Sequence, residues 1–402
     1  MAREIKIEEF SYKLPEDKIA KTPLLERSDS KLLFYNKGLI KDYKFKNIVE
    51  LVSPKCTLIF NNTKVVCARI IFENSIKANK PIEIFVLEPL GNLSIEATML
   101  QKGSSKWICL IGNYRFFDSN SLEKTLHINN TDVTLKIHKP IKLNDVFEVE
   151  FEWNADFSFA EILNLAGVIP LPPYLKRVAD ENDASRYQTV YSKQEGSVAS
   201  PTAGLHFTNE ILEDLRRNDI STEYVVLHVG TGTFKPVKTK SMKDHTMHSE
   251  EIIVTKATII NLLKNVDNLI AVGTTSLRTL ESLFWIGLKL HNESANIQIK
   301  QWDAYDFEIP PEFDYKKALE SVLNYLELSR QDSIKTKTQL LIAPGYKIRS
   351  VKGIITNFHQ PNSTLLLLIA ALVGNDWKKI YEHALNNDYR FLSYGDSSFL
   401  LT

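Results

Sequence analysis

The chain has 402 residues, of which 44% are hydrophobic and 24% are charged, and its formal net charge is zero. This composition is that of a globular protein and excludes the fibrous and low-complexity classes. No apolar run approaches the ~18 residues of a membrane-spanning helix, and the first ten residues contain no apolar leader. The three cysteines have no Cys-x-x-Cys spacing, which is unfavourable for a disulfide framework or a zinc ribbon. We therefore expect a cytoplasmic protein of two or three domains.

The first part of the chain contains short apolar runs bounded by turn residues. Residues 56–60 predict a strand that stops at the polar turn formers Asn61 and Asn62. Between 68 and 151, β-rich runs follow one another at a spacing of roughly 8–12 residues, with no convincing helical period. The predicted strands cover 69–72, 82–87, 94–99, 107–110, 125–128, 133–137 and 146–151. This pattern predicts a small antiparallel barrel or sandwich.

From residue 155 onward, predicted helices alternate with predicted strands. The helices cover 159–165, 209–217, 256–264, 277–290, 363–374 and 377–386, and the strands cover 223–229, 268–272, 351–355 and 391–394. Such alternation is typical of an α/β sheet whose functional loops follow the carboxyl ends of its strands. The polar stretch 291–338, with one helix at 315–328, is predicted to be an insertion outside this sheet.

The predicted fold class is therefore α/β, with a mixed-sheet domain and an inserted small antiparallel β-barrel. The α/β catalytic domain is discontinuous and is formed by 1–67 and 152–402. The barrel domain occupies 68–151, where the sequence pattern changes.

Histidines are concentrated at predicted strand ends and in turns rich in glycine and threonine: His206, His228, His245, His248 and His359. After His228, the turn contains Gly230 and Gly232, which allow a ligand to approach the backbone closely. Residues 244–250 bring two imidazoles and two carboxylates within seven positions. A general acid/base cluster, a hydrogen-bonded structural turn and a metal site are all compatible with this segment, although His-x-x-His does not match the spacing of a zincin.

A predicted helix opens directly after the apolar strand at 268–272, and its first turn contains Thr274, Thr275 and Ser276. Helix N-termini bind anions such as carboxylates through free N–H groups, and Arg278 adds further donors. Ordinary N-capping by Thr275 or Ser276 is the alternative interpretation. Glu281, one turn later, is in a position to brace Arg278.

Nucleic-acid binding is compatible with two further features. Tyr174 ends a rigid proline-rich segment and is a candidate stacking platform for a base, with core packing as the alternative. Lysines and an arginine are concentrated at 235–243 and 335–352, which fits either an RNA contact or a solvated surface.

Nine short motifs in one order resemble the S-adenosylmethionine:tRNA ribosyltransferase-isomerases. They are FNNT at 60–63 with AR at 68–69, PLPPY at 170–174, YQTVY at 187–191, PTAGLHF at 201–207, LHVGTGTF at 227–234, DHTMHSE at 244–250, GTTS at 273–276, TNFH at 356–359 and YRFLSYGD at 389–396. The motifs run nearly from end to end. Each is weak alone, and their joint order is specific.

The resemblance implies an unusual use of S-adenosylmethionine as a ribosyl donor. The acceptor is 7-aminomethyl-7-deazaguanine in tRNA, the product is epoxyqueuosine-tRNA, and adenine and methionine leave. The family's fold is an α/β domain with an inserted β-barrel. We expect no metal or bound cofactor, no membrane partner, and a monomer. A divergent paralogue with another acceptor, an RNA-binding module and a metal-dependent hydrolase are the alternatives.

The chemistry that the resemblance implies needs a base for the proton next to the sulfonium and an acid for the departing adenine. The catalytic candidates are His206, His228, His248 and Glu250 for proton transfer, and Asp244 for stabilising the sulfonium. Substrate binding is expected of Asn61, Asn62, Arg69, Tyr174, Gly204, Gly230, Gly232, Thr274, Thr275, Ser276, Arg278, Asn357, His359 and Asp396. Arg278 is the expected clamp for the methionine carboxylate, and Asp396 is a second candidate for the sulfonium.

The chain departs from the family pattern at several positions. Lys64 and Cys67 stand where the family usually has arginine and proline, and Ala343 stands where it usually has tyrosine. Residues 100–117 lack the expected arginine-rich run, which puts the barrel's part in tRNA binding in doubt. The stretch 291–338 is atypical of the family.

Overall fold

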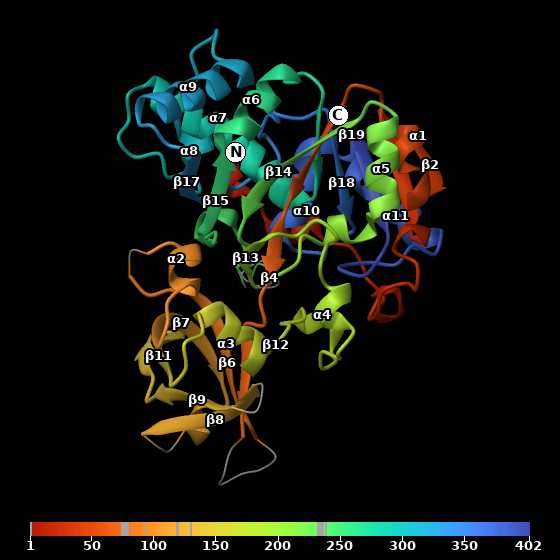
Figure 1. The fold of residues 1–402 in the computed structure, drawn as a ribbon. Coiled ribbons are helices and arrows are strands. Elements are labelled where there is room, and N and C mark those ends of the chain that lie inside the picture. Colours follow the sequence, from red (N-terminus) through yellow and green to blue (C-terminus); the bar gives the residue numbers. More distant parts are fainter. Residues whose placement is uncertain are drawn as a thin grey trace.

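The computed structural model describes residues 2–73, 80–91, 93–117, 120–128, 131–230, 237 and 239–402. Two sheets dominate it, one in the upper part of Figure 1 and one in the lower part. A short parallel pair, β4 (Thr63–Val65) and β13 (Gln194–Ser197), lies between them. No helix within the described ranges is both long enough and apolar enough to cross a membrane.

Within the described residues, the larger sheet has the strand order β17-β15-β14-β3-β16-β18-β19-β1-β2. Its strands are β1 (Lys31–Asn36), β2 (Leu39–Lys44), β3 (Thr57–Asn61), β14 (Ser221–Leu227), β15 (Glu250–Thr255), β16 (Leu269–Val272), β17 (Ser333–Thr338), β18 (Gly353–Asn357) and β19 (Ser397–Leu401). The neighbours β14, β3, β16 and β18 are parallel to one another. Strand β15 is antiparallel to both of its neighbours, whereas β19 is antiparallel to β18 and parallel to β1. The sheet is therefore mixed, with a parallel centre.

This topology places the ends of several strands at one edge. The parallel strands β3, β14, β16 and β18 end there, and the antiparallel strands β15 and β19 begin there. The edge therefore brings together residues that are far apart in the sequence: Asn61, His228, Glu250, Gly273, Asn357 and Asp396. In a sheet of this kind, the carboxyl edge of the parallel strands is the usual place for a ligand.

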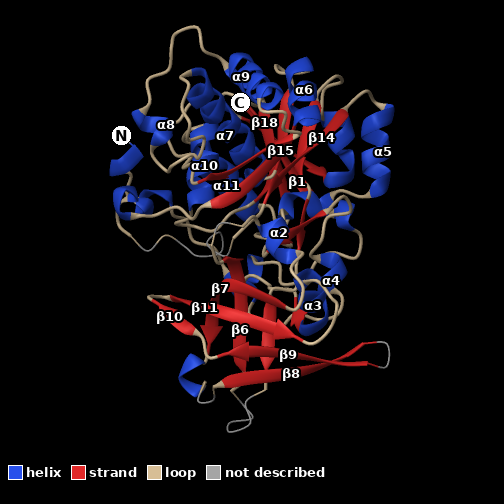
Figure 2. Ribbon diagram, turned by 60° about the vertical axis from the view of Figure 1, so that its left-hand side comes forward, coloured by secondary structure: helices blue, strands red, loops and turns tan. Residues whose placement is uncertain are grey.

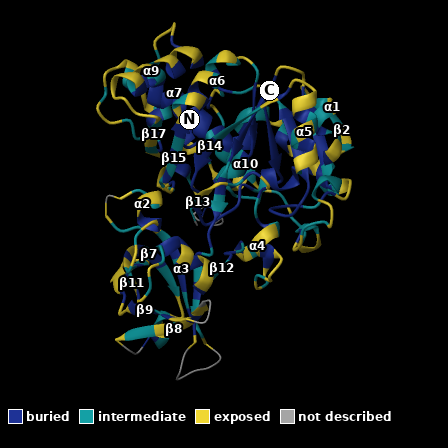
Figure 3. Cartoon of the chain, in the orientation of Figure 1, coloured by how far each residue is buried: buried dark blue, intermediate teal, exposed yellow. Residues whose placement is uncertain are grey.

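Helices cover the larger sheet. The longer ones are α5 (Asn209–Arg217), α6 (Lys256–Lys264), α7 (Thr274–His291), α9 (Tyr315–Leu328), α10 (Thr364–Val373) and α11 (Asp376–Asn386), and the short ones are α1 (Ile48–Leu51) and α8 (Asp303–Asp306). The short helix α4 (Asp183–Arg186) lies below the larger sheet in Figure 1, toward the second sheet. Figure 3 shows exposed residues on the outer helices α5, α6 and α9.

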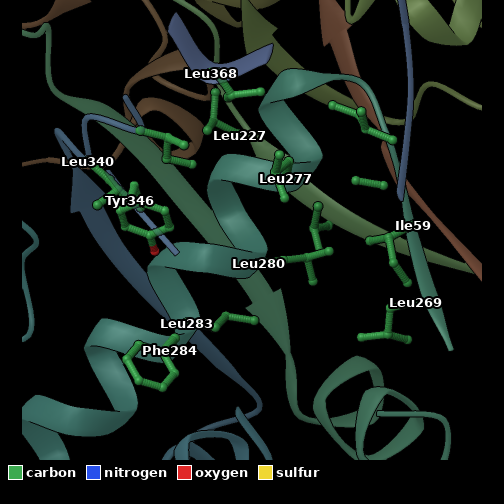
Figure 4. Close-up of a cluster of buried hydrophobic side chains, with 14 of the residues drawn as sticks. Ile59, Leu227, Leu269, Leu277, Leu280, Leu283, Phe284, Leu340, Tyr346 and Leu368 are labelled. Atoms are coloured by element: carbon green, nitrogen blue, oxygen red, sulfur yellow. The ribbon is translucent and has the colours of Figure 1, made fainter. Parts of the chain in front are cut away.

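Helix α7 is the centre of the largest core. Leu277, Leu280 and Leu283 are fully buried along it and belong to the same cluster as Ile59 and Leu269 of the sheet (Figure 4). A helix that is apolar on almost every side needs partners on every side. Strands supply them on one face of α7, and α9 and the segment around Tyr346 supply them elsewhere.

The second sheet has its own core. Its strands are β5 (Arg69–Phe72), β6 (Ile82–Pro89), β7 (Ser104–Gly112), β8 (Ser121–Ile128), β9 (Thr131–His138), β10 (Ile141–Leu143), β11 (Val146–Trp153) and β12 (Gly167–Val168). Among the described residues, the hydrogen-bonded order runs from β12 to β8 through antiparallel pairs, with β10 beside β11 (Figure 2). Helix α3 (Phe159–Ala166) packs into this core, and Trp107 stacks on Phe159.

The second sheet is curled, and between its described strands the hydrogen-bonded order does not close. Lys124 of β8 reaches across the gap and donates to Ile71 O of β5 at 3.2 Å and to Ala166 O at 2.9 Å. A side chain therefore bridges the two ends where a closed barrel would have paired strands. The sequence predicts a barrel here, and the structure supports the coarser description of a curled antiparallel half-barrel.

Two predicted elements are wrong. Residues 94–99 form the short helix α2 (Ile95–Met99), because Ser94 caps it by accepting from Ala97 N at 3.2 Å. Residues 391–394 are not a strand, since Leu392 has a φ of +70° that interrupts extended backbone. The last strand is β19 instead.

The stretch 291–338 is also not an insertion outside the sheet. Its strand β17 pairs with β15 at the edge of the larger sheet, and its helix α9 packs on α7 and α6. Only Ile334 is a buried apolar residue in β17, while Lys335 and Lys337 are on the strand as well. Edge strands often carry lysine, so the apolar alternation that identifies a strand is missing here.

The close approach of α7 and α9 gives a stability prediction. A Cβ added at Gly287 would lie 2.3 Å from Ala318 O. We expect Gly287→Ala to lower the free energy of unfolding by roughly 1–3 kcal/mol, because the two helices must separate. Denaturant titration measures this. Gly230→Ala, where an added Cβ would meet nothing within 4 Å, is the matched control. An unchanged midpoint for Gly287→Ala would contradict the packing of α9 on α7.

Candidate active site at the carboxyl edge of the larger sheet

A cleft opens where the parallel strands end. Its empty volume, counted out to open solvent, is about 760 Å³. The loops after β16 and β18 form one wall, and segments around 174, 200 and 393 form the other. The lining residues include Tyr174, Thr202, Thr274, Thr275, Asn357, His359 and Ser393.

The N-terminus of α7 faces this cleft without a side-chain cap. Gly273 is the N-cap, and its φ of +90° is a conformation that favours glycine. The hydroxyl of Ser276 donates backwards to Val272 O at 2.8 Å, and the Thr275 hydroxyl accepts from Asn61 Nδ2 at 3.2 Å. The alternative of N-capping by Thr275 or Ser276 is therefore wrong. The first N–H groups of an 18-residue helix remain available for an anion.

Behind the cleft, His206 fixes the orientation of Asn357. Asn357 Oδ1 accepts from the Thr202 hydroxyl at 3.0 Å, and Asn357 Nδ2 donates to His206 Nε2 at 3.2 Å. His206 Nδ1 lies 2.8 Å from Ser30 Oγ. These contacts are satisfied by a neutral imidazole with its proton on Nδ1. Burial, followed by the charge of Arg390, lowers the pKa of His206 to about 3, in agreement with the neutral form.

Glu250 and Arg278 form a buried ion pair. Glu250 Oε1 accepts from Gly230 N at 3.2 Å, and Oε2 accepts from Arg278 Nη2. The side chains are 4% and 13% exposed, so the pair is held away from solvent. A buried carboxylate that loses its partner is strongly destabilising. The pair therefore fastens the start of β15 to the first turns of α7.

Comparison with known proteins gives the family. The family described as queuosine biosynthesis protein matches residues 7–400. A relative from Finegoldia magna named S-adenosylmethionine:tRNA ribosyltransferase-isomerase is 35% identical over 98% of this chain and 97% of its own length. Relatives of the same name from Thermoanaerobacter and Francisella philomiragia are 35% and 34% identical, over 99% and 98% of this chain and all of their own lengths. This chain belongs to the queuosine biosynthesis protein family.

Among solved structures, the crystal structure of an S-adenosylmethionine tRNA ribosyltransferase from Thermotoga maritima is similar over 98% of this chain and all of that one. The identity is 24% and the TM-score is 0.46. Membership of the queuosine biosynthesis family follows from the sequence relatives.

In this member of the queuosine biosynthesis family, two further predicted histidines lie at the same edge. His228 is 4% exposed, and its Nδ1 lies 2.9 Å from Thr63 Oγ1. Burial lowers its pKa to about 4. His359 lines the cleft, its Nε2 lies 3.1 Å from Thr356 Oγ1, and burial lowers its pKa to about 3. Both imidazoles are neutral at pH 7.

The acidic and histidine-rich segment 244–250 lies beside a second cavity, between the two sheets. This junction cavity, of about 1130 Å³, is lined by His228, His248 and Glu250 from the larger sheet's edge and by residues of β6, β7 and α2 from the second sheet. Val229 lines both the cleft and the junction cavity, so the two adjoin. His248 is exposed, and Asp244 is exposed outside either lining.

The two sheets also meet directly at the junction cavity. Lys335 of β17 forms an ion pair with Glu96 of α2 at 2.9 Å. A Cβ added at Gly196 would lie 2.6 Å from Ile95 of α2 and 3.0 Å from His228. Helix α2 is therefore in close contact with the edge that holds the predicted histidines.

Several predicted binding residues have structural partners. Asn61 is fully buried and bonds to Leu227 N and O. Both carboxylate oxygens of Asp396 accept backbone N–H groups, from Lys31 at 2.9 Å and Arg390 at 2.7 Å. A Cβ at Gly204 would lie 1.8 Å from the Tyr191 hydroxyl, so packing alone requires a small residue there.

The remaining predicted positions differ in their relation to the cleft. Tyr174 lines it, and its hydroxyl lies 2.5 Å from Ser393 Oγ. Asn62 is beside Asn61, and its side-chain oxygen is buried with no hydrogen-bond partner in the described part of the chain. Arg69 lies on the second sheet, paired with Glu83 at 2.7 Å. Gly232 is outside the described residues.

The predicted pairing of Glu281 with Arg278 is wrong. Glu281 is fully buried and accepts from the hydroxyls of Tyr346 and Ser350, both at 2.6 Å. Arg278 turns to Glu250 instead, and it is absent from the lining of the cleft. A helix places residues three apart on one face, which made the local pairing reasonable, but tertiary partners decide both side chains.

Sequence reasoning missed the hydroxyls that set the site. Ser30, Thr63 and Thr202 hold His206, His228 and Asn357 in place. Thr63 and Thr202 lie inside recognised motifs, so a signal existed for them, whereas Ser30 had none. Over the described part of the chain, no group of three or more His, Cys, Asp or Glu side chains is arranged to hold a metal ion.

The depressed histidine pKa values predict acid sensitivity. An unfolded histidine has a pKa near 6.5, so below that pH the unfolded chain binds protons that buried His228 does not, and stability falls as pH falls. Between pH 7 and pH 5 this costs about 2 kcal/mol for one such histidine.

His228→Asn keeps a side-chain partner for Thr63 and removes the titration. Denaturant unfolding at pH 7 and pH 5 measures how far the free energy of unfolding falls. In the variant this fall should be smaller than in wild type by about 2 kcal/mol. His127→Asn, on the exposed strand β8, should match wild type. An equal fall in all three proteins would contradict the buried, neutral state of His228.

Proposed function

We propose that this chain transfers and isomerises the ribosyl moiety of S-adenosylmethionine onto 7-aminomethyl-7-deazaguanine in tRNA. The product is epoxyqueuosine-tRNA, and adenine and methionine are released. Relatives of this name cover nearly the whole chain at 34–35% identity, which supports the tRNA enzyme and gives no support to a paralogue with another acceptor.

The observation that carries the proposal is the uncapped N-terminus of α7 in the cleft. The donor has one carboxylate, on its methionine part, and a helix N-terminus is an anion site. The N–H groups of Thr274, Thr275 and Ser276 would receive that carboxylate. Arg278 supports this seat indirectly, because its ion pair with Glu250 fixes the first turns of α7.

Asn357 and His359 would contact the donor from the loop after β18, beside the start of α7 in the lining of the cleft. Asn357 is held by Thr202 and His206, so its amide is already oriented before any ligand binds. We assign His206 a positioning role, since both of its ring nitrogens are occupied behind Asn357. Ordered polar groups of this kind bind without a cost of reorganisation.

For proton transfer we propose His248, with His228 as its neighbour at the wall shared by the two cavities. A base acts best when its pKa is near the working pH, and the pKa of His228, at about 4, is far below it. His248 is exposed in the same cavity lining and close enough to influence His245. His248 takes the proton next to the sulfonium and can return it to adenine, which departs with the electron pair of its glycosidic bond. Methionine departs with the electron pair of its carbon–sulfur bond, and the amino group of the acceptor forms the new carbon–nitrogen bond and loses a proton to solvent.

We further propose that the second sheet, with its core strands between 68 and 151, acts as an inserted half-barrel domain that presents the RNA to the junction cavity. Its helix α2 and strands β6 and β7 line that cavity. We expect a cytoplasmic enzyme that acts as a monomer without a metal or bound cofactor, and S-adenosylmethionine is consumed as a co-substrate.

An adenine-release assay tests the proposal. Purified protein is mixed with S-adenosylmethionine and an anticodon stem-loop that carries 7-aminomethyl-7-deazaguanine, and free adenine is followed by chromatography. We expect adenine only when the modified RNA is present. His248→Ala should lower the rate by ~10²–10⁴-fold, the range of a general acid/base group.

His291→Ala is the matched control, because His291 is exposed at the C-terminal end of α7 and lines neither cavity. It should keep the wild-type rate. Two results would contradict the proposed reaction. One is adenine release at the same rate with and without the modified base, and the other is no release from a folded protein that binds the donor.

A further inference from the structure

A third cavity, of about 310 Å³, lies on the other side of His206 from the cleft. Three arginines line it: Arg27, Arg186 and Arg390. We call it the arginine pocket. It shares Ser393 with the lining of the cleft, so the two spaces adjoin.

Positive charge in the arginine pocket exceeds negative charge. Over the described residues, neither Arg27 nor Arg186 has a carboxylate within ion-pair distance, and Arg390 is 3.7 Å from Asp396. Asp396 already accepts two backbone N–H groups. The nearby Asp183 is paired with Arg177 at 2.6 Å. The pocket therefore holds three guanidinium groups beside one carboxylate that is already occupied.

The excess charge affects the neighbouring groups. Burial, and then the charge of Arg186, lowers the pKa of Arg27. The charges of Arg390 and Arg27 add to the burial that lowers the pKa of His206. An anion in the pocket would relieve both effects, since opposite charges stabilise each other strongly where water is partly excluded.

The guanidinium groups are also held in place. Arg27 donates to Gln188 O at 2.6 Å and to Ser185 O at 2.9 Å, and Arg186 donates back to Leu25 O at 3.0 Å. The two arginines thus fasten the segments 24–27 and 185–188 to each other. Arg186 Nε is buried and has no hydrogen-bond partner among the residues that the structure describes. These bonds fix the geometry before an anion arrives, and an unmet donor remains.

We propose that the arginine pocket binds a backbone phosphate of the acceptor RNA, next to the nucleotide that reacts. The inference rests on the proposed function. S-adenosylmethionine has no phosphate, and its one carboxylate is assigned to α7, so the donor does not supply this anion. An RNA acceptor has a phosphate on each side of every nucleotide. The paired N–H donors of an arginine guanidinium match the spacing of phosphate oxygens well.

Arg390→Gln is the best test. Among the described residues the Arg390 guanidinium makes no hydrogen bond, and the carboxylate paired with it, that of Asp396, is 3.7 Å away. Affinity for the modified stem-loop is measured by fluorescence anisotropy over a series of salt concentrations. We expect a loss of roughly tenfold, the size of one charge-assisted hydrogen bond. The slope of log K against log salt should become less negative by ~0.7–0.9, the value for one phosphate contact.

Arg216→Gln is the matched control. Arg216 is an exposed arginine of α5 at the opposite edge of the sheet, beside Ser221 at the start of β14. It should keep the wild-type affinity and slope. Donor affinity by calorimetry and the thermal unfolding midpoint should be unchanged in both variants, which separates loss of RNA contact from loss of fold.

A second measurement uses the wild-type protein. A stem-loop with one neutral methylphosphonate beside the modified nucleotide should bind wild type about tenfold more weakly. The same stem-loop should bind Arg390→Gln no more weakly than the unmodified-backbone stem-loop does, because the effects of removing two partners of one contact are not additive.

The outcomes distinguish the two proposals. If wild type binds no modified RNA, the proposed function fails and the pocket loses its assigned occupant. If wild type binds RNA while Arg390→Gln keeps its affinity and slope, only the pocket assignment is overturned. A third outcome is that inorganic phosphate raises the thermal unfolding midpoint of wild type but not of Arg390→Gln, while the two proteins bind RNA equally well. That result would show a site for free phosphate and would also overturn the pocket assignment.

Discussion

The whole site depends on how α7 begins. Strand β16 ends at Val272, Gly273 turns the chain with a φ of +90°, and the helix starts at the next residue. The body of α7 is buried among the sheet, α9 and the Tyr346 segment, so its first turn cannot move independently. The hydroxyls of that turn are used elsewhere, on Val272 O and Asn61. The backbone N–H groups are therefore left to face the cleft.

Buried polar groups then fix the neighbours of that turn. Glu250 and Arg278 fasten β15 to α7, and Glu281 gathers donors from the Tyr346 and Ser350 segment one turn further along. His206 orients Asn357 in the neighbouring loop after β18. Each group is costly to bury alone and is stable only with its partners present, so the cleft keeps one arrangement before substrate binds.

Local signals predicted much of the fold. Helices α5, α6 and α9 and strand β5 have the predicted bounds, because their apolar period and their caps are in the local sequence, as with Thr208 before α5 and Asp314 before α9. Strand ends were also predicted well enough to place the histidines at one edge. Helix α2 was missed because Ser94 caps an element too short for a period, and β17 because lysines replace its apolar alternation.

The candidate site was predictable as a set of motifs but not as a set of contacts. Arg278 lies three residues from Glu281 and 28 from Glu250, yet it pairs with Glu250. The arginine pocket collects single residues from positions 27, 186 and 390. No periodicity relates such positions, since only the tertiary fold brings them together. Histidine roles changed for the same reason, because burial and partners decide whether an imidazole is free to act.

The most direct test of the role of α7 is a calorimetric comparison of S-adenosylmethionine with its decarboxylated analogue, which differs only by the carboxylate assigned to the start of that helix. A helix N-terminus with free N–H groups in a partly buried site favours an anion by up to ~2 kcal/mol. We therefore expect the analogue to bind wild type more weakly by roughly ten- to thirtyfold, which is that energy expressed as a ratio. Equal affinities would show that the carboxylate lies elsewhere, and they would contradict the binding of the donor at the N-terminus of α7.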